Sequence, residues 1–151
     1  MVYNLKTATI IFKKSMNKEY IEQRANGWIE KIEQLYSFIA ETLKDEPDVR
    51  YKTDQNMIMR EEMMERHGVS PKQVPIFDLF VKNQLKVTFK PIGLWVIGAK
   101  GRVDILTPKG AYILADIGDD DIHPHWAVFA SGRAKRKQEV FDAEFVKKLV
   151  H

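Results

Sequence analysis

The stretch that decides the fold runs from Ile76 to Ile117 and reads IFDLFVKNQLKVTFKPIGLWVIGAKGRVDILTPKGAYILADI. Five apolar, β-branched runs in it (IFDLFV, LKVTFK, LWVIG, RVDILT and AYILADI) are separated by short groups of turn residues, and such runs predict strands. Connections this short join antiparallel neighbours, because a parallel pair needs a crossover of a dozen residues or more. The stretch therefore predicts an antiparallel meander of five strands, to which WAVFA (126–130) adds a sixth.

The sequence before the meander has the period of a helix. A mostly apolar stripe from Ile21 to Thr42 recurs at alternating spacings of four and three residues, which predicts one amphipathic helix over Lys18–Lys44. Pro47 ends it, because the residue before a proline disfavours helix. The stripe is either core or a self-association seam, which would use Trp28, Ile32, Leu35 and Ile39. We favour core, and the sequence leaves open whether Gly27 interrupts the helix.

Shorter elements complete the prediction. TATIIFK (7–13) and VRYKT (49–53) are typical of strands, the methionine-rich residues 53–68 predict a second helix, and SPKQ (70–73) predicts a helical turn. A last helix is predicted over about 142–150, with Asp142 as its cap.

Together these elements indicate an α+β fold in one domain, 1–151. The helical part covers about 15–75, the β-meander about 76–130 and the C-terminal helix about 142–150.

Composition excludes several classes of function. The chain has no cysteine, which removes thiol catalysis, thiolate metal sites and disulfides and is compatible with a cytoplasmic location. No apolar run approaches the roughly 20 residues of a membrane helix, so we expect no membrane association. The formal net charge of +3 is too small to indicate nucleic acid by itself.

The loop DIGDDDIHPHW (116–126) is the first candidate site. A divalent metal could be held by Asp119, Asp121, His123 and His125, because carboxylate and imidazole are ligands of zinc, manganese and iron. Against this, one loop supplies an incomplete site, and aspartates in loops more often bond their own backbone. We therefore favour a polar connection between strands and expect no cofactor.

The second candidate is the basic run at 133–137. Arg133, Lys135, Arg136 and Lys137 could contact phosphates of a nucleic acid, or could neutralise the acidic loop about a dozen residues earlier.

No complete catalytic motif occurs in the sequence, which favours a non-catalytic protein over an enzyme. The prediction is a small interaction module that binds a protein partner or forms a homodimer. The alternative is a nucleic-acid-binding protein, in one version a metal-dependent nuclease, that uses the basic run 133–137 and the Asp/His loop 116–125.

Overall fold

A computed structural model describes residues 17–131 and 137–151. In chain order the elements are α2 (Lys18–Leu43), β1 (Val49–Lys52), β2 (Asn56–Met59), α3 (Glu62–Arg66), β3 (Lys72–Pro75), β4 (Phe77–Val81), β5 (Gln84–Gly93), β6 (Arg102–Thr107), β7 (Gly110–Asp116), β8 (Trp126–Ala130), β9 (Gln138–Val140) and α4 (Ala143–Leu149). The predicted strand at 7–13 lies outside the described residues.

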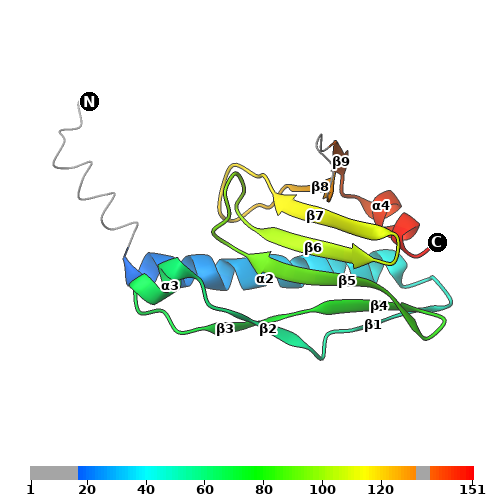
Figure 1. Cartoon of the computed structure of the whole chain (residues 1–151), viewed down its shortest axis with the longest axis horizontal. Helices are drawn as coiled ribbons and strands as arrows, with labels where there is room; N and C mark the ends of the chain where they lie inside the picture. Colours follow the sequence, from blue (N-terminus) through cyan, green and yellow to red (C-terminus); the bar gives the residue numbers. More distant parts are fainter. Residues whose placement is uncertain (1–16, 132–136) are drawn as a thin grey trace.

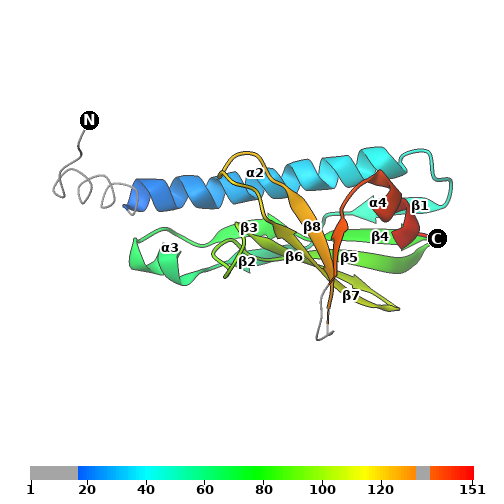
Figure 2. The same cartoon turned by 90° about the horizontal axis from the view of Figure 1, so that it is seen from above.

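The α+β prediction is confirmed. Seven strands form an antiparallel sheet in the order β1-β4-β5-β6-β7-β8-β9, and β2 pairs with β3 in a separate two-stranded sheet. Helix α2 lies along one face of the larger sheet, behind it in Figure 1 and above it in Figure 2. We call the face that packs on α2 the inner face and the opposite face the outer face.

The apolar stripe of α2 forms the core with the inner face of the sheet. Trp28, Ile32, Leu35 and Ile39 are buried in one cluster with strand residues such as Leu114. Burial of an aliphatic side chain of this size contributes about 1.5–3 kcal/mol. The helix continues through Gly27 without a break.

The predicted second helix over 53–68 is wrong for most of its length. Residues 56–59 form β2, whose exposure alternates so that Met57 and Met59 turn inward while Ile58 is exposed. The helix is limited to α3, and the predicted helical turn at 70–73 is replaced by β3. The physical reason is pairing with a strand further along the chain. Strand β3 forms hydrogen bonds with β2, and this pairing overrides the local helix preference of the methionines in β2.

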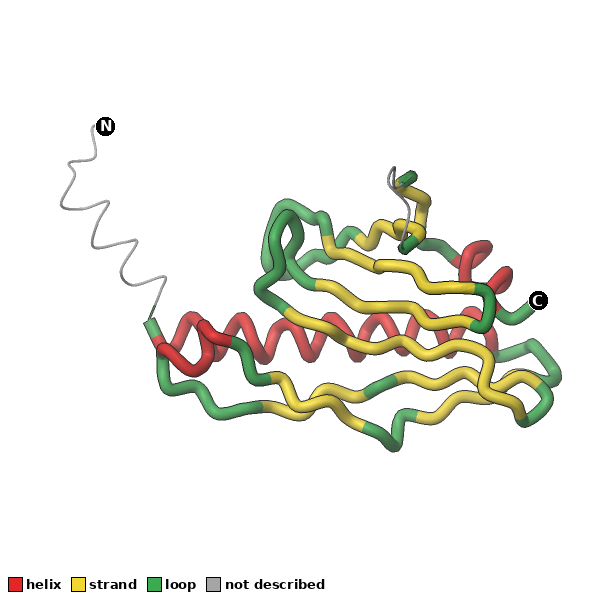
Figure 3. Tube along the Cα trace, viewed as in Figure 1, coloured by secondary structure: helices red, strands yellow, loops and turns green. Residues whose placement is uncertain are grey.

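These strands belong to one long antiparallel ribbon. β1 pairs with β4 and β2 pairs with β3, and Ile76 N donates to Gln55 O at 2.8 Å across the break between them. Figure 3 shows the ribbon running past the end of the central strands towards α3. The part predicted as helical, about 15–75, thus also holds three strands.

The meander differs from its prediction in two places. LWVIG is not a strand: β5 extends through Pro91 to Gly93, and residues 94–101 form a loop. The Glu61 carboxylate accepts hydrogen bonds from Leu94 N and Trp95 N at 3.1 Å, so these amides are not available to a ladder. Strand β9 was not predicted, and it pairs with β8. Strands β1 and β9 together bring the number of strands in the larger sheet to seven.

Candidate functional site

The acidic loop is anchored by a buried ion pair. Asp116, at the end of β7, is fully buried, and its Oδ2 lies 2.7 Å from Nζ of Lys31 on α2. Its Oδ1 accepts hydrogen bonds from the backbone of Gly118 and His125, each at 2.9 Å. Both oxygens are therefore satisfied, and this carboxylate closes the loop onto the helix.

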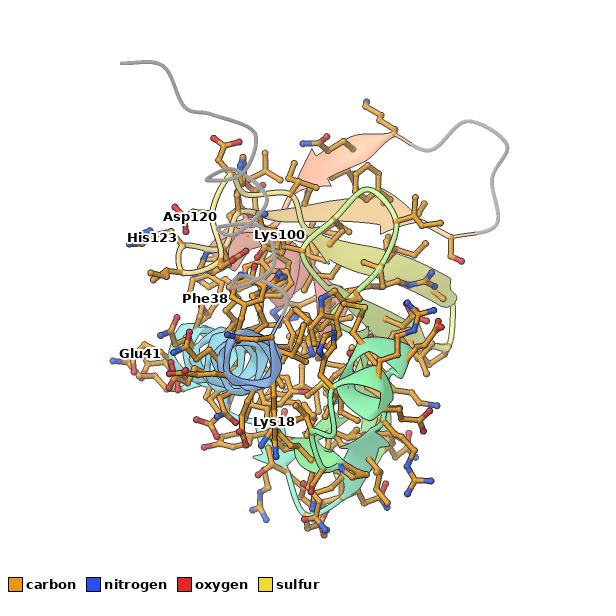
Figure 4. The ribbon with its side chains drawn as sticks, turned by 90° about the vertical axis from the view of Figure 1, so that its left-hand side faces the viewer. Lys18, Phe38, Glu41, Lys100, Asp120 and His123 are labelled. Carbon is orange, nitrogen blue, oxygen red and sulfur yellow. The ribbon has the colours of Figure 1, made fainter. Side chains whose placement is uncertain are left out.

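Asp120 closes the tip of the loop. Its Oδ1 accepts from Ile122 N at 2.8 Å and His123 N at 2.6 Å, and its Oδ2 lies 3.1 Å from His123 Nδ1. These hydrogen bonds, the backbone ones first, lower the pKa of Asp120 from 3.8 to about 2. Asp120 and His123 lie on the outside of the loop in Figure 4.

Asp121 turns the other way and contacts α2. Its carboxylate lies 3.6 Å from Arg24 Nε and 3.5 Å from Lys100 Nζ, and it accepts a hydrogen bond from the Tyr20 hydroxyl at 3.3 Å. The loop is thus tied to the helix at Asp121 as well as at Asp116. The loop is a polar connection between β7 and β8, and Asp116 and Asp120 bond its own backbone.

The four predicted metal ligands do not converge in the described part of the chain. Asp121 faces α2, while Asp119, His123 and His125 are exposed. In residues 17–131 and 137–151, no group of three or more histidine, aspartate or glutamate side chains is arranged to hold a metal ion.

The basic run falls mostly outside the described residues. Arg133, Lys135 and Arg136 lie in the undescribed segment 132–136, and Lys137 is exposed. Nucleic-acid binding through this run stays a prediction.

The four residues of the predicted self-association seam lie in the core of a single chain. Trp28, Ile32 and Ile39 are at most 1% exposed, and Leu35 is also buried. Self-association through them would require α2 to leave the sheet.

A groove lies between the C-terminal half of α2 and the edge strand β1. It has a volume of about 710 Å³ and is lined by side chains of both elements, including Tyr36, Ala40, Leu43 and Tyr51, and by Leu79 of β4. Its floor is apolar and buried, since Leu43 and Leu79 are 4% and 1% exposed. We call this the α2–β1 groove.

Tyr36 lines the groove, and hydrogen bonds fix its position. Its hydroxyl donates to the backbone oxygens of Pro75 at 2.6 Å and Phe89 at 3.4 Å. Burial, and secondarily the charge of Asp78, raises the pKa of Tyr36 well above its usual range. The side chain is therefore uncharged, and its hydroxyl is hydrogen-bonded to backbone oxygens of β3 and β5.

Strand β1 directs part of its backbone away from β4, towards the groove. Lys82 N donates to Asp48 O at 3.0 Å, and bonded and non-bonded pairs alternate along an antiparallel ladder. The alternation directs the backbone of Arg50 and Lys52 to β4 and that of Val49 and Tyr51 to the opposite side, where Val49 N donates to Glu46 O at 3.3 Å. Tyr51 is half exposed there, with its ring stacked on Phe77.

The charged side chains that line the groove are Glu41, Lys44 and Arg50. Arg50 and Lys52 are exposed on β1, and neither forms an ion pair with a residue of the described ranges. On the helix side, a hydrogen bond to Glu41 raises the pKa of Lys44 and keeps that pair neutral overall.

Sequence reasoning identified VRYKT as a strand but not its role as an edge. The sequence signal for an edge was limited to one aromatic residue between two basic ones. Only the strand order shows that β1 pairs with a single strand of the described ranges.

The comparisons with known proteins identify no relative: no family model, no curated protein and no solved structure matches this chain. Within the described residues, no helix has the length and apolarity required to cross a bilayer.

Proposed function

We propose that this protein is a non-catalytic interaction module that binds an extended, acidic segment of another protein in the α2–β1 groove. The segment adds to the open edge of β1 as a further strand. In this mode main-chain hydrogen bonds supply affinity, and pockets for alternate side chains supply specificity. The observation that carries the proposal is the edge of β1, which has no partner strand on this side within residues 17–131 and 137–151 and lies beside a groove with an apolar floor.

The groove matches the geometry of an added strand. Side chains of a strand alternate between its two faces, so every second residue of the segment would point between α2 and Leu79 on the inner face. The remaining side chains would lie on the outer face, beside Arg50 and Lys52.

Charge favours an acidic partner over a second copy of this chain. If two β1 edges paired in antiparallel fashion, Arg50 and Lys52 of one copy would lie beside the same residues of the other. Like charges opposite each other across a ladder are destabilising, whereas acidic residues at those positions would be stabilising.

The experiment is a selection from a displayed library of random peptides, followed by affinity measurement of the selected peptides by calorimetry. We expect acidic peptides with alternating apolar residues. Ala40→Trp fills the groove and should weaken them at least about tenfold, a typical effect of steric misfit in an apolar pocket. Glu33→Trp places the same ring on an exposed position of α2 and should leave the affinity unchanged.

A second pair of variants tests strand addition itself. Tyr51→Pro removes an N–H at the open edge and spares the β1–β4 ladder, while Tyr51→Thr keeps that N–H and removes only the ring. We expect both to weaken binding, and Tyr51→Pro to weaken it more. Failure to select any peptide, or equal binding to the parent and to Ala40→Trp, would overturn the proposal.

A further inference from the structure

The outer face of the sheet carries an apolar hollow that the proposed function does not use. It has a volume of about 530 Å³ and lies between the sheet and the loop 94–101. Its walls include Ile92, Ile113 and Phe129 from the strands and Val96 and Ile97 from the loop. The volume lies within the range of about 300–1,000 Å³ that is typical of small-molecule sites.

The hollow results from the sizes of residues that neighbour one another across the sheet. Arg102 is in register with Gly93 on one side and Ala115 on the other, and Ala115 is in register with Ala127. Apart from Arg102, the residues of this row are small, and the row lies beside one of large residues, in which Ile113 is paired with Phe129. The difference in side-chain length leaves a depression that the loop 94–101 overhangs. It is separate from the core on the inner face, whose cluster includes neither Ile113 nor Ala115.

One charged side chain lines the hollow. Arg102 directs Nε and Nη2 to the carboxylate of Asp104, at 2.8 and 3.3 Å. No acceptor within residues 17–131 and 137–151 bonds its Nη1, so this nitrogen is available to a ligand. Lys90 is opposite Asp104 in the ladder, which gives the three side chains a net charge of one positive unit.

The apolar wall is incompletely covered by the chain itself. The side chain of Ile97, at the tip of the loop, is fully exposed, and Ile92 is 42% exposed. Covering apolar surface is favourable by about 25 cal/mol for each Å² removed from water. A ligand with an apolar body would cover both residues.

From this combination we propose that the hollow binds an amphipathic carboxylate of the medium-chain fatty acid class. The acyl chain lies along Ile113, Phe129 and the underside of the loop, and the carboxylate accepts a hydrogen bond from Arg102 Nη1. A single carboxylate matches the one net positive charge. This site and the α2–β1 groove lie on opposite faces of the sheet, so the two proposals are independent.

The test is calorimetric titration of the full chain with dodecanoate and with dodecanol, an uncharged molecule of the same chain length. We expect one dodecanoate to bind per chain, and dodecanol to bind more weakly. Ala115→Leu fills the hollow and should weaken dodecanoate at least about tenfold, as steric misfit in an apolar pocket typically does. Ala111→Leu adds the same side chain to the same face of β7, two positions before Ile113, and should change nothing.

The charged end is tested separately. Arg102→Gln should weaken dodecanoate by about ten- to a hundredfold, the usual value of a hydrogen bond to a charged group, and should leave dodecanol unchanged. Absence of dodecanoate binding, or equal binding to the parent and to Ala115→Leu, would overturn the site. Equal loss of both ligands in Arg102→Gln would overturn the assignment to a carboxylate. Sedimentation analysis tests whether a second copy of the chain occupies the hollow instead of a fatty acid. A dimer that dissociates in the Ile97→Asp variant would show this and would overturn the proposal.

Discussion

The carboxylate of Asp116 lies where β7, the acidic loop and α2 meet. It is bonded to Lys31 on the helix and to two backbone amides of the loop, and the two charged side chains are shielded from water. A buried ion pair gains little over an apolar pair of the same shape, but removing one partner leaves an uncompensated buried charge. The pair therefore fixes where the loop lies on α2 more than it adds to stability.

Lys31→Met should destabilise the protein by about 3–5 kcal/mol, because it leaves the Asp116 carboxylate buried without its cation. Adding Asp116→Asn should recover part of the loss, since an amide oxygen still accepts from the loop backbone and carries no charge. Urea unfolding of the parent, the single variant and the double variant measures both effects. A single-variant loss below about 1 kcal/mol would show that the pair is accessible to water.

Gly101 is required by close approach as well as by backbone conformation. Its φ is +149°, and a Cβ atom there would lie 2.1 Å from Cζ3 of Trp28. Gly101→Ala should therefore cost about 1–3 kcal/mol of overpacking in addition to backbone strain. Gly110→Ala is the matched control, because Gly110 has a φ of +141° and open space around its Cβ position. Equal destabilisation of the two variants in urea would show that Trp28 moves aside freely.

Asp120 should titrate at about pH 2 in the folded protein, observed by NMR of its side-chain carboxyl carbon. Because the folded pKa is lowered, its contribution to stability is present above the ordinary value of 3.8 and is lost as the pH falls towards 2. His123→Ala should raise the midpoint only in part, since the backbone amide of residue 123 remains as a donor. A midpoint near 3.8 in the parent would mean that the tip of the loop is open in solution.

At the scale of elements, α2 forms as its sequence predicts. The alternating spacing of its apolar residues needs only local geometry and one apolar surface to pack against. Asn17 caps its start by accepting from Tyr20 N, and the helix runs for 26 residues.

Gly27→Ala should stabilise the protein by about 0.5–1 kcal/mol, because glycine in a helix interior loses more backbone entropy on folding than alanine. The Cβ would meet no atom within 4 Å, so no clash opposes this gain. Thermal and urea unfolding give the change, and a lower midpoint would indicate that α2 needs a flexible position there.

The ribbon of β1, β2, β3 and β4 shows where local prediction fails. Residues 53–68 contain good helix formers, and helix forms only where the chain reverses, at α3. Residues 56–59 instead pair with 72–75, more than a dozen residues further on. Helix propensity is a weak preference of a few tenths of a kcal/mol per residue, so a partner strand overrides it.

At the scale of the whole molecule, the two outermost strands of the sheet are β1 and β9, and within the described part of the chain each pairs with one strand. Basic side chains on an edge strand discourage pairing between copies of the same chain. Arg50 and Lys52 thus serve two purposes in our proposal: they oppose self-pairing of β1 and attract an acidic segment.

Replacing Arg50 and Lys52 together by threonine should increase self-association, because it removes the charges from β1 and keeps its strand preference. Analytical ultracentrifugation of the parent and the variant at matched concentrations measures this. Replacing Lys147 and Lys148 removes the same amount of charge from α4 instead of β1 and is the control. No difference between the edge variant and the parent would show that these charges do not guard β1.

The candidate sites were predictable to different degrees. The acidic loop was correctly placed between two strands, because turn-forming residues lie between two apolar runs. The different roles of its aspartates were not predictable: Asp116 is buried, Asp120 closes the tip, and Asp121 contacts α2. These roles depend on Lys31 and Arg24, which lie on a helix far away in the sequence. The α2–β1 groove and the outer hollow were not predicted, because each is formed by elements far apart in the sequence.

The sequence by itself determined the α+β class, the extent of α2, the antiparallel sense of the sheet and the cap of α4. These features follow from periodicity, turn residues and short connections, all of which act over a few residues. Only the tertiary structure decided which strand forms the edge, that 56–59 is a strand, and which residues line the groove and the hollow. The physical reason is that pairing and cavity shape depend on contacts between distant segments, and no local pattern records which segments meet.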